Sequence, residues 1–443
     1  MTQCFEVRPG SSLRGRLRVP GDKSISHRSI MLGSIAEGTT HVSGFLEGAD
    51  AISTMNVCRA LGVRIEGPEA GRVVVHGVGR DGLRASASPL DCGNAGTAMR
   101  LLIGLLAGQR FGSTLIGDES LSKRPMRRVA DPLSRMGALI HTQEGRPPVR
   151  IEPAPSRLTA IDYLMPMASA QVKSSLLLAG LYADGETSVT EPATTRDHTE
   201  RMLEGFGVRL SRQGATVRIR GGQALQATDI DVPADISSAA FFLVGASIAQ
   251  GADLLIEHVG VNPTRTGVLD ILQLMGANIE RRNERLVGGE PVADLHVRSA
   301  PLRGIAVPPE LVPLAIDEFP VLFVAAACAT GRTVVTGAEE LRVKESDRIA
   351  VMADGLRVLG VAATPTPDGM IIEGKGGGAL PVFGSGTIAS HGDHRIAMAF
   401  AMAALRAGGA LRIDDTLNVA TSFPGFVELA ARAGLGIGET ALG

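Results

Sequence analysis

The chain contains no tryptophan, and only 3% of its 443 residues are aromatic. Proteins that bind single-stranded nucleic acid stack the bases on aromatic side chains, so this composition argues against that role. The formal net charge is −2, so no overall basic field would attract nucleic acid either. We therefore expect no nucleic-acid partner.

Cysteine is also scarce. Cys4, Cys58, Cys92 and Cys328 form no Cys-x-x-Cys pair and have no spacing suited to zinc, so we interpret them as reduced thiols in a reducing compartment. Long apolar runs are missing as well, because a run such as 319–329 is too short to cross a bilayer. The first residues lack the basic and apolar segments of a signal peptide. These features predict a cytoplasmic protein without a membrane partner.

Glycine, in contrast, is abundant, and it marks a repeat. Six times, an Ala- or Leu-rich run ends in a glycine before a β-branched run, and a second run then ends in another glycine. The first glycines are Gly38, Gly108, Gly185, Gly251, Gly331 and Gly409. The second are Gly62, Gly137, Gly207, Gly276, Gly360 and Gly434, which are 75, 70, 69, 84 and 74 residues apart.

We interpret each glycine as the left-handed residue that ends a helix before a strand. The repeating unit is then βαβαββ, about 70 residues long, because a helix between two strands allows parallel pairing. Apolar residues crowd segments such as 238–244, so the helices should be buried on nearly all sides. The fold class predicted is α/β, with two domains that each contain three βαβαββ units around buried parallel helices.

The segment 20–28 reads Pro-Gly-Asp-Lys-Ser-Ile-Ser-His-Arg and precedes an apolar run. It predicts a turn and a helix start with Lys23, Ser24 and Arg28 around one point. The first turn of a helix has free backbone N–H groups and a partial positive charge, so the added cations would suit a phosphate or carboxylate. A solvated basic helix start would explain the segment equally well.

Five further segments place polar or charged residues beside predicted helices: 91–100, 118–126, 167–175 with 194–199, 315–320, and 339–348 with 391–398. In the second, Pro125 is predicted at the first position of a helix, with Arg124 at its mouth. In the fourth, Asp317 precedes a strongly apolar helix and is suited to proton transfer. Ordinary capping, close helix packing or solvated charge would explain each segment taken alone.

Taken together and in order, these motifs resemble those of the 5-enolpyruvylshikimate-3-phosphate synthases, or 3-phosphoshikimate 1-carboxyvinyltransferases. The matching segments are 20–28, 93–100, 123–126, 169–173, 195–198, 316–320, 341–348, 393–398 and 421–424. The family's enolpyruvyl transferase-like fold has two domains of three βαβαββ units. The resemblance implies one lobe of 1–20 and 235–443, a second of 21–234, chain crossings near Pro20 and 232–237, and an active site in the cleft between the lobes.

The resemblance also implies the reaction. Such enzymes transfer the enolpyruvyl group of phosphoenolpyruvate to the 5-hydroxyl of shikimate 3-phosphate and release phosphate. The reaction proceeds by addition and elimination through a tetrahedral intermediate, on the shikimate pathway to chorismate and the aromatic amino acids. No metal and no organic cofactor is implied, and we expect a monomer whose partners are its two small-molecule substrates.

Residue roles are carried over from the family. Shikimate 3-phosphate is assigned to Lys23, Ser24, Arg28, Ser169, Ala170, Gln171, Arg196, Asp317 and Lys344. Phosphoenolpyruvate is assigned to Lys23, Asn94, Gly96, Arg124, Gln171, Arg348 and Arg395. The catalytic residues implied are Asp317 as base toward the 5-hydroxyl, Glu345 as acid toward the methylene carbon, and Lys23 in the proton relay or at the leaving phosphate.

Charge supports this assignment. The two substrates together bring about six negative charges, since each has a phosphate and a carboxylate, and a water-poor site penalises any unpaired ion. Seven cations are assigned to them: Lys23, Arg28, Arg124, Arg196, Lys344, Arg348 and Arg395. The sequence thus predicts near-neutralisation.

Two positions depart from the family pattern. Thr421 stands where many members have a Lys, so one phosphoenolpyruvate contact is in doubt. The wording of 316–320, 341–344 and 421–424 resembles a subgroup that tolerates the inhibitor glyphosate, yet Gly96 stands where that subgroup often has Ala. The missing methyl leaves room for the inhibitor, so tolerance is an open hypothesis.

Two alternatives were weighed. UDP-N-acetylglucosamine enolpyruvyltransferases resemble this fold, but they use a loop cysteine just before an Arg-Pro pair, and 117–125 contains none. A non-catalytic protein that binds phosphorylated metabolites would keep the cations but would need neither Asp317 nor Glu345. Loss of phosphate release in variants of the two acids would separate an enzyme from such a binder.

Overall fold

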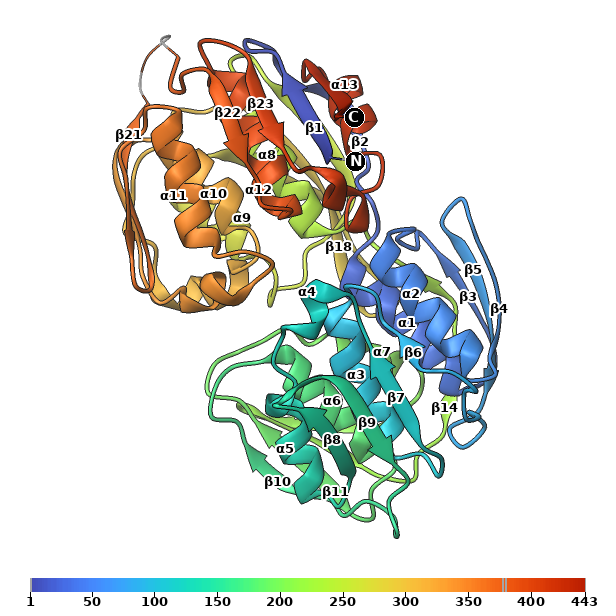
Figure 1. The fold of residues 1–443 in the computed structure, drawn as a ribbon. Coiled ribbons are helices and arrows are strands. Elements are labelled where there is room, and N and C mark those ends of the chain that lie inside the picture. The colour runs from blue at the N-terminus through green and yellow to red at the C-terminus, as the bar shows by residue number, and fades with distance from the viewer. Residues whose placement is uncertain (1, 377, 379–380, 443) are drawn as a thin grey trace. The chain divides into compact units, whose positions relative to one another are not determined.

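A computed structural model describes residues 2–376, 378 and 381–442 of the chain (Figure 1). The chain forms two compact units. Unit 1 comprises Met1–Pro20, Pro233–Leu286 and Pro291–Gly443, and unit 2 comprises Gly21–Val232 and Val287–Glu290. The chain therefore passes from one unit to the other at four points, two of which flank a short segment at 287–290.

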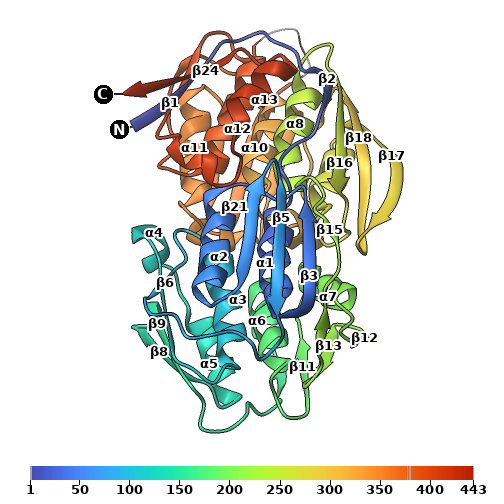
Figure 2. The same cartoon turned by 90° about the vertical axis from the view of Figure 1, so that its right-hand side faces the viewer.

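Two of the three sheets of unit 2 follow one local pattern of strand, helix, strand, helix and hairpin (Figure 2). The first contains β6 (Leu90–Asp91), α3 (Gly96–Ala107), β7 (Ser113–Ile116), α4 (Glu119–Ser122), α5 (Arg127–Arg135), β8 (Leu139–Gln143) and β9 (Arg146–Glu152). The second contains β10 (Asp162–Leu164), α6 (Ala170–Gly180), β11 (Glu186–Thr190), α7 (His198–Gly205), β12 (Leu210–Gln213) and β13 (Thr216–Arg220). The strand orders β6-β7-β9-β8 and β10-β11-β13-β12 are equivalent.

The third sheet of unit 2 has the same order but takes its first strand from a distant part of the chain. Its elements are α1 (Lys23–Ile35), β3 (Ala36–Ser43), α2 (Ala49–Ala60), β4 (Arg64–Glu69), β5 (Arg72–Val78), β14 (Leu225–Gln226) and β15 (Ile230–Asp231). Both β14 and β15 pair in parallel with β3, so the last strands of unit 2 complete the unit that begins at α1.

Unit 1 contains the other three sheets. One holds β2 (Arg14–Leu17), α8 (Ile236–Ile248), β16 (Asp253–Gly260), α9 (Gly267–Leu274), β17 (Asn278–Val287) and β18 (Glu290–Arg298). The next holds η1 (Pro309–Leu311), η2 (Pro313–Ala315), α10 (Phe319–Cys328), β19 (Thr330–Val335), η3 (Glu339–Val343), α11 (Arg348–Val358), β20 (Ala363–Thr366) and β21 (Gly369–Lys375). The last holds β22 (Gly386–Ala389), α12 (His394–Ala403), η4 (Ala404–Arg406), β23 (Leu411–Asp414), η5 (Leu417–Thr421), α13 (Phe426–Ala433), β24 (Ile437–Leu442) and β1 (Thr2–Val7).

The predicted α/β fold of repeated βαβαββ units is confirmed. In unit 1, β2 supplies the first strand of one sheet and β1 supplies the last strand of another, as the pairings β16–β2 and β1–β23 show. The middle sheet begins with bridges from Arg303 and Ala306 to β19. The predicted burial of 238–244 is also confirmed, because every residue of α8 is buried.

The second glycine of each repeat ends a helix as predicted. All six have φ between +79° and +114°. The same two hydrogen bonds recur each time: after α2, for example, Gly62 N donates to Arg59 O and Val63 N donates to Cys58 O. This is the Schellman arrangement, in which the left-handed residue satisfies the last carbonyl groups of the helix.

The prediction was wrong for the first glycines, which do not terminate the preceding helices in this way. Helix α1 ends at Ile35 and Ala36 is already extended, so Gly38 lies inside β3. Likewise Gly331 lies inside β19. These helices pass directly into a strand, so no left-handed turn separates the two. Gly108 has helical φ and serves another purpose, because a Cβ there would lie 2.3 Å from the ring of Tyr182.

The helix-ending role can be tested at α7, where two glycines differ only in backbone conformation. Neither Gly205 nor Gly207 has an atom within 4 Å of an added Cβ, but only Gly207 has positive φ, +85°. We expect Gly207→Ala to lower the free energy of unfolding by about 1–2 kcal/mol. Gly205→Ala, inside the helix, should raise it by up to about 1 kcal/mol. Urea unfolding measures both, and equal shifts would contradict the assignment.

Candidate functional site

In unit 2, the first turns of α1, α3 and α6 lie side by side. Gln171 Nε2, in the first turn of α6, donates to Thr97 Oγ1 of the first turn of α3 at 2.9 Å. Arg28 Nη2 of α1 donates to Ser174 Oγ of α6 at 3.1 Å. The three helices carry most of the predicted ligand-binding residues of this unit at these ends. Their partial positive charges therefore add in one region.

Arg28 is the most deeply placed of these cations, with 4% exposure. It donates to Thr199 Oγ1 at 2.7 Å, to the Ser24 carbonyl at 3.0 Å and to Ser174 Oγ. Burial lowers the pKa of Arg28 to about 10, while Glu200 and Asp22 oppose the shift and Arg196 adds to it. The guanidinium thus stays charged at neutral pH and is held in one orientation.

Lys23 and Ser24 begin α1, directly after the capping residue. Asp22 accepts a hydrogen bond from Ile25 N at 2.9 Å, which fixes the start of the helix as the sequence predicts. Lys23 Nζ lies 3.2 Å from Asp50 Oδ2. The predicted catalytic lysine therefore has a carboxylate partner that the sequence analysis did not identify.

Arg124, Asn94 and Gly96 lie together at the start of α3. Arg124 Nη2 donates to Asn94 Oδ1 at 3.0 Å, and Asn94 Nδ2 donates to Asp118 Oδ2 at 2.7 Å. A Cβ on Gly96 would lie 3.1 Å from Arg124 Nη1. Glycine at this position is what lets the guanidinium lie so close to the helix start.

The prediction that Pro125 starts a helix was wrong, because α5 begins at Arg127. Arg100 Nη2 donates to the Pro125 carbonyl at 3.1 Å, and Met126 N donates to Gly145 O at 2.7 Å. These two bonds hold the chain in a turn for two more residues. Arg124 consequently belongs to the loop before α5.

Ser169, Ala170 and Gln171 begin α6. Ser169 caps the helix by accepting from Val172 N at 3.4 Å. Gln171 Oε1 accepts from Arg100 Nη1 at 2.6 Å. Arg100, 4% exposed, was quoted in the sequence motif but given no role; its signal was its place one turn into a helix whose start was predicted to bind a ligand.

In unit 1, the starts of α8, α10 and α12 also meet. Ser237 Oγ of α8 donates to Glu318 Oε1, which precedes α10. Arg395 Nη1 of α12 lies 4.0 Å from the same oxygen. Glu318 is 1% exposed, and sequence reasoning missed it because a single carboxylate before an apolar helix looks like a cap.

Arg348 holds the two predicted catalytic acids of unit 1. Its Nη2 lies 2.7 Å from Glu345 Oε2, and its Nη1 lies 3.6 Å from Asp317 Oδ1. Its Nε donates to Asp393 Oδ2 at 2.8 Å. Burial alone would lower the pKa of Arg348, which is 1% exposed, but Asp393 and Glu345 raise it above its usual value.

Lys344 lies on the other side of Asp317. Its Nζ is 3.4 Å from Asp317 Oδ1 and 2.7 Å from Glu340 Oε1. The structure thus brings together Asp317, Lys344, Glu345 and Arg348, and Arg395 lies near the same helix starts through Glu318. Thr421 ends η5 and donates to Asn418 O at 2.7 Å, so it supplies no charge.

The charge count made from the sequence needs correction. Seven cations were set against six substrate charges, but several already have carboxylate partners. Lys23 pairs with Asp50, Lys344 with Glu340, and Arg348 with Asp393 and Glu345. A buried cation needs such partners when no ligand is bound, so the net charge of the clusters is less positive than the count of cations.

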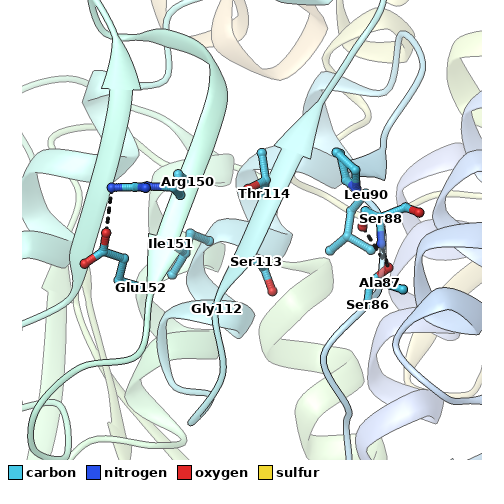
Figure 3. Close-up of a pocket in the computed structure, with 11 residues that line it drawn as sticks. Ser86, Ala87, Ser88, Leu90, Gly112, Ser113, Thr114, Arg150, Ile151 and Glu152 are labelled. Atoms are coloured by element: carbon cyan, nitrogen blue, oxygen red, sulfur yellow. Dashed lines mark hydrogen bonds and ion pairs between the residues drawn. The ribbon is translucent and has the colours of Figure 1, made fainter.

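A pocket of about 310 Å³ lies beside β6, β7 and β9 (Figure 3). Its lining includes Ser86, Ser113, Thr114 and the ion pair between Arg150 Nη2 and Glu152 Oε1. None of the residues predicted to bind substrate lines it. The candidate site therefore rests on the helix starts described above and not on this pocket.

Comparisons with known proteins agree with the geometry. A model of the family "EPSP synthase (3-phosphoshikimate 1-carboxyvinyltransferase)" matches residues 7–429. A 3-phosphoshikimate 1-carboxyvinyltransferase from Alkalilimnicola ehrlichii is 67% identical, over 98% of this chain and 96% of the relative. One from Nitrosococcus oceani is 64% identical, over 98% and 97%. A solved structure of EPSP synthase from Acinetobacter baumannii aligns with a TM-score of 0.91 and 59% identity, and covers 100% of both chains.

His27, inside α1, gives a pH test of this region. Its ring is buried with Nδ1 2.8 Å from Thr54 Oγ1, and burial lowers the pKa of His27 from 6.5 to about 3. Between these values the unfolded chain binds a proton that the folded chain does not, so stability falls as the pH drops below 6.5. From pH 7 to pH 5 the loss due to His27 should be about 2 kcal/mol.

Urea unfolding of the wild type and of His27→Gln at the two pH values measures this loss. Gln cannot titrate, so the variant should lose about 2 kcal/mol less than the wild type. The difference between the two proteins removes the contributions of other groups. The same loss in both would show that His27 is not held neutral by burial.

Proposed function

The chain belongs to the EPSP synthase (3-phosphoshikimate 1-carboxyvinyltransferase) family, and we propose from this premise how its own residues carry out the family's reaction. The protein is an enzyme of the shikimate pathway that transfers the enolpyruvyl group of phosphoenolpyruvate to shikimate 3-phosphate. Phosphate is the second product. The comparisons give no support to the alternatives of a UDP-N-acetylglucosamine enolpyruvyltransferase or a non-catalytic binder.

We propose that the helix starts of unit 2 bind shikimate 3-phosphate through a constellation of cations, hydroxyls and backbone N–H groups. Arg28 and Arg196 supply charge, and the amino end of α6 supplies N–H donors. Asp317 and Lys344 of unit 1 complete the set. The residues are Lys23, Ser24, Arg28, Ser169, Ala170, Gln171, Arg196, Asp317 and Lys344. The buried, three-fold hydrogen-bonded Arg28 is the observation that supports this assignment best.

Phosphoenolpyruvate is proposed to contact both units as well. The residues are Lys23, Asn94, Gly96, Arg124, Gln171, Arg348 and Arg395. The adjacency of Arg124, Asn94 and Gly96 supports the unit 2 part of this set. The planar guanidinium groups suit carboxylate and phosphate, to which they can donate two parallel hydrogen bonds.

For the chemistry, we propose that Asp317 accepts the proton of the 5-hydroxyl as its oxygen bonds to C2 of phosphoenolpyruvate. Glu345 donates a proton to the methylene carbon, which becomes a methyl group. The tetrahedral intermediate then loses phosphate, and a proton leaves the methyl group to re-form the double bond. Arg348 contacts both acids and so holds them at one place. Lys23 is assigned to the proton relay or to the leaving phosphate.

We propose further that the enzyme works in the cytoplasm as a monomer. All four cysteines are buried free thiols, which is typical of a reducing compartment. A single chain carries every residue assigned to both substrates. Among the described residues, no helix has both the length and the apolar character needed to cross a membrane.

The two acids provide the decisive test of the proposed chemistry. Asp317→Asn and Glu345→Gln keep size and polarity but cannot exchange the required proton. We expect each to lower the rate of phosphate release by about 10²–10⁴-fold, the usual contribution of a positioned acid or base. Phosphate release is measured with both substrates, and shikimate 3-phosphate binding by calorimetry should persist in Glu345→Gln.

The matched control is Glu339→Gln, an exposed acid of η3 five residues before Asp317's neighbour Lys344. It should turn over like the wild type. Unchanged turnover in Asp317→Asn or Glu345→Gln would refute the role of that acid. A wild-type chain that releases no phosphate would refute the proposed reaction as a whole.

A further inference from the structure

The hairpin formed by β17 and β18 belongs to two parts of the molecule. Its strands lie in a sheet of unit 1, where β18 pairs with β16. Its tip, Val287–Glu290, belongs to unit 2. Gly288 and Gly289 both have positive φ, +57° and +84°, which is the backbone of a tight two-residue hairpin turn. The tip is thus a short, sharply turned part of unit 2 that comes from a remote stretch of the chain.

The tip is joined to the start of α7 by a buried polar contact. His198 Nδ1 lies 2.8 Å from Glu290 Oε1, and the two side chains are 2% and 5% exposed. Arg201 Nη1 of the same helix donates to the Gly289 carbonyl at 3.1 Å. A buried carboxylate and imidazole that satisfy each other fix their geometry tightly, since either one alone would bear an uncompensated desolvation cost.

The start of α7 in turn holds Arg28. Thr199, next to His198, accepts from Arg28 Nε at 2.7 Å and donates to Ser174 Oγ at 2.7 Å. Arg196 lies two residues before His198 on the approach to the same helix. A shift of the start of α7 would therefore move Thr199 and Arg196 together and would release one hydrogen bond from Arg28.

We propose that Glu290 is a positioning residue for shikimate 3-phosphate: through His198 it fixes the start of α7 and thereby orients Arg28 and Arg196. The inference rests on the proposed function, because it assumes that these two arginines bind that substrate. Electrostatics point the same way, since Glu290 is among the carboxylates that raise the pKa of Arg28 against the effect of burial.

The test compares substrate affinities of the full chain in Glu290→Ala and Glu290→Gln. Alanine removes the acceptor for His198, so the dissociation constant of shikimate 3-phosphate should rise about tenfold. Glutamine keeps an acceptor oxygen at the same distance and should restore most of the affinity. The KM for phosphoenolpyruvate, measured at saturating shikimate 3-phosphate, should change less than about twofold.

Glu284→Ala is the matched control, because Glu284 is an exposed acid on β17 of the same hairpin. It should bind both substrates like the wild type. A role in stability alone would lower the unfolding temperature of Glu290→Ala but leave its affinity for shikimate 3-phosphate unchanged well below that temperature. That result, or an equal loss of affinity for both substrates, would overturn the proposal.

If Glu290→Ala does not fold, His198→Ala removes the same contact from the other side and must give the same selective loss. An unchanged affinity in folded His198→Ala would equally overturn the proposal. The wild type separates this inference from the function on which it rests. Failure of the wild-type chain to bind shikimate 3-phosphate would refute the function, whereas tight binding by both wild type and Glu290→Ala would refute only the role of Glu290.

Discussion

Each unit buries three helices next to one another, and their amino ends meet at one end of the group. In unit 2 this is shown by the contact between Gln171 and Thr97, and in unit 1 by the contact between Ser237 and Glu318. Three sheets of the same topology surround each group, so the repeat places three helix starts together without help from any single residue. Aligned helix dipoles and N–H groups are suited to anions, and both substrates of the family are polyanions.

The two units use this arrangement differently. Unit 2 places Arg28 and Arg124 at its helix starts and satisfies them largely with hydroxyl, amide and carbonyl oxygens. Unit 1 places carboxylates there, and Arg348 is held by Asp393 and by the two acids assigned to proton transfer. The division matches the proposed chemistry, in which unit 2 mainly binds anions and unit 1 also moves protons.

Local sequence patterns predicted the repeat well because the signal is physical and recurs. A left-handed residue after a helix, such as Gly62, favours glycine. The pattern failed at Gly38, where a helix runs directly into a strand. It could not show that β14 and β15 complete the sheet of β3, since strand pairing across about 190 residues leaves no local mark. The same limit hid Asp50 and Glu290, whose partners are distant in sequence.

The account's central claim is that shikimate 3-phosphate is held at the helix starts of unit 2. The most direct measurement is a crystal structure of the full chain grown with that substrate. The account predicts that the anionic groups of the substrate contact Lys23, Arg28 and the amino end of α6. Substrate bound in the pocket beside Ser113 and Arg150, or at any place where it touches none of those groups, would contradict it.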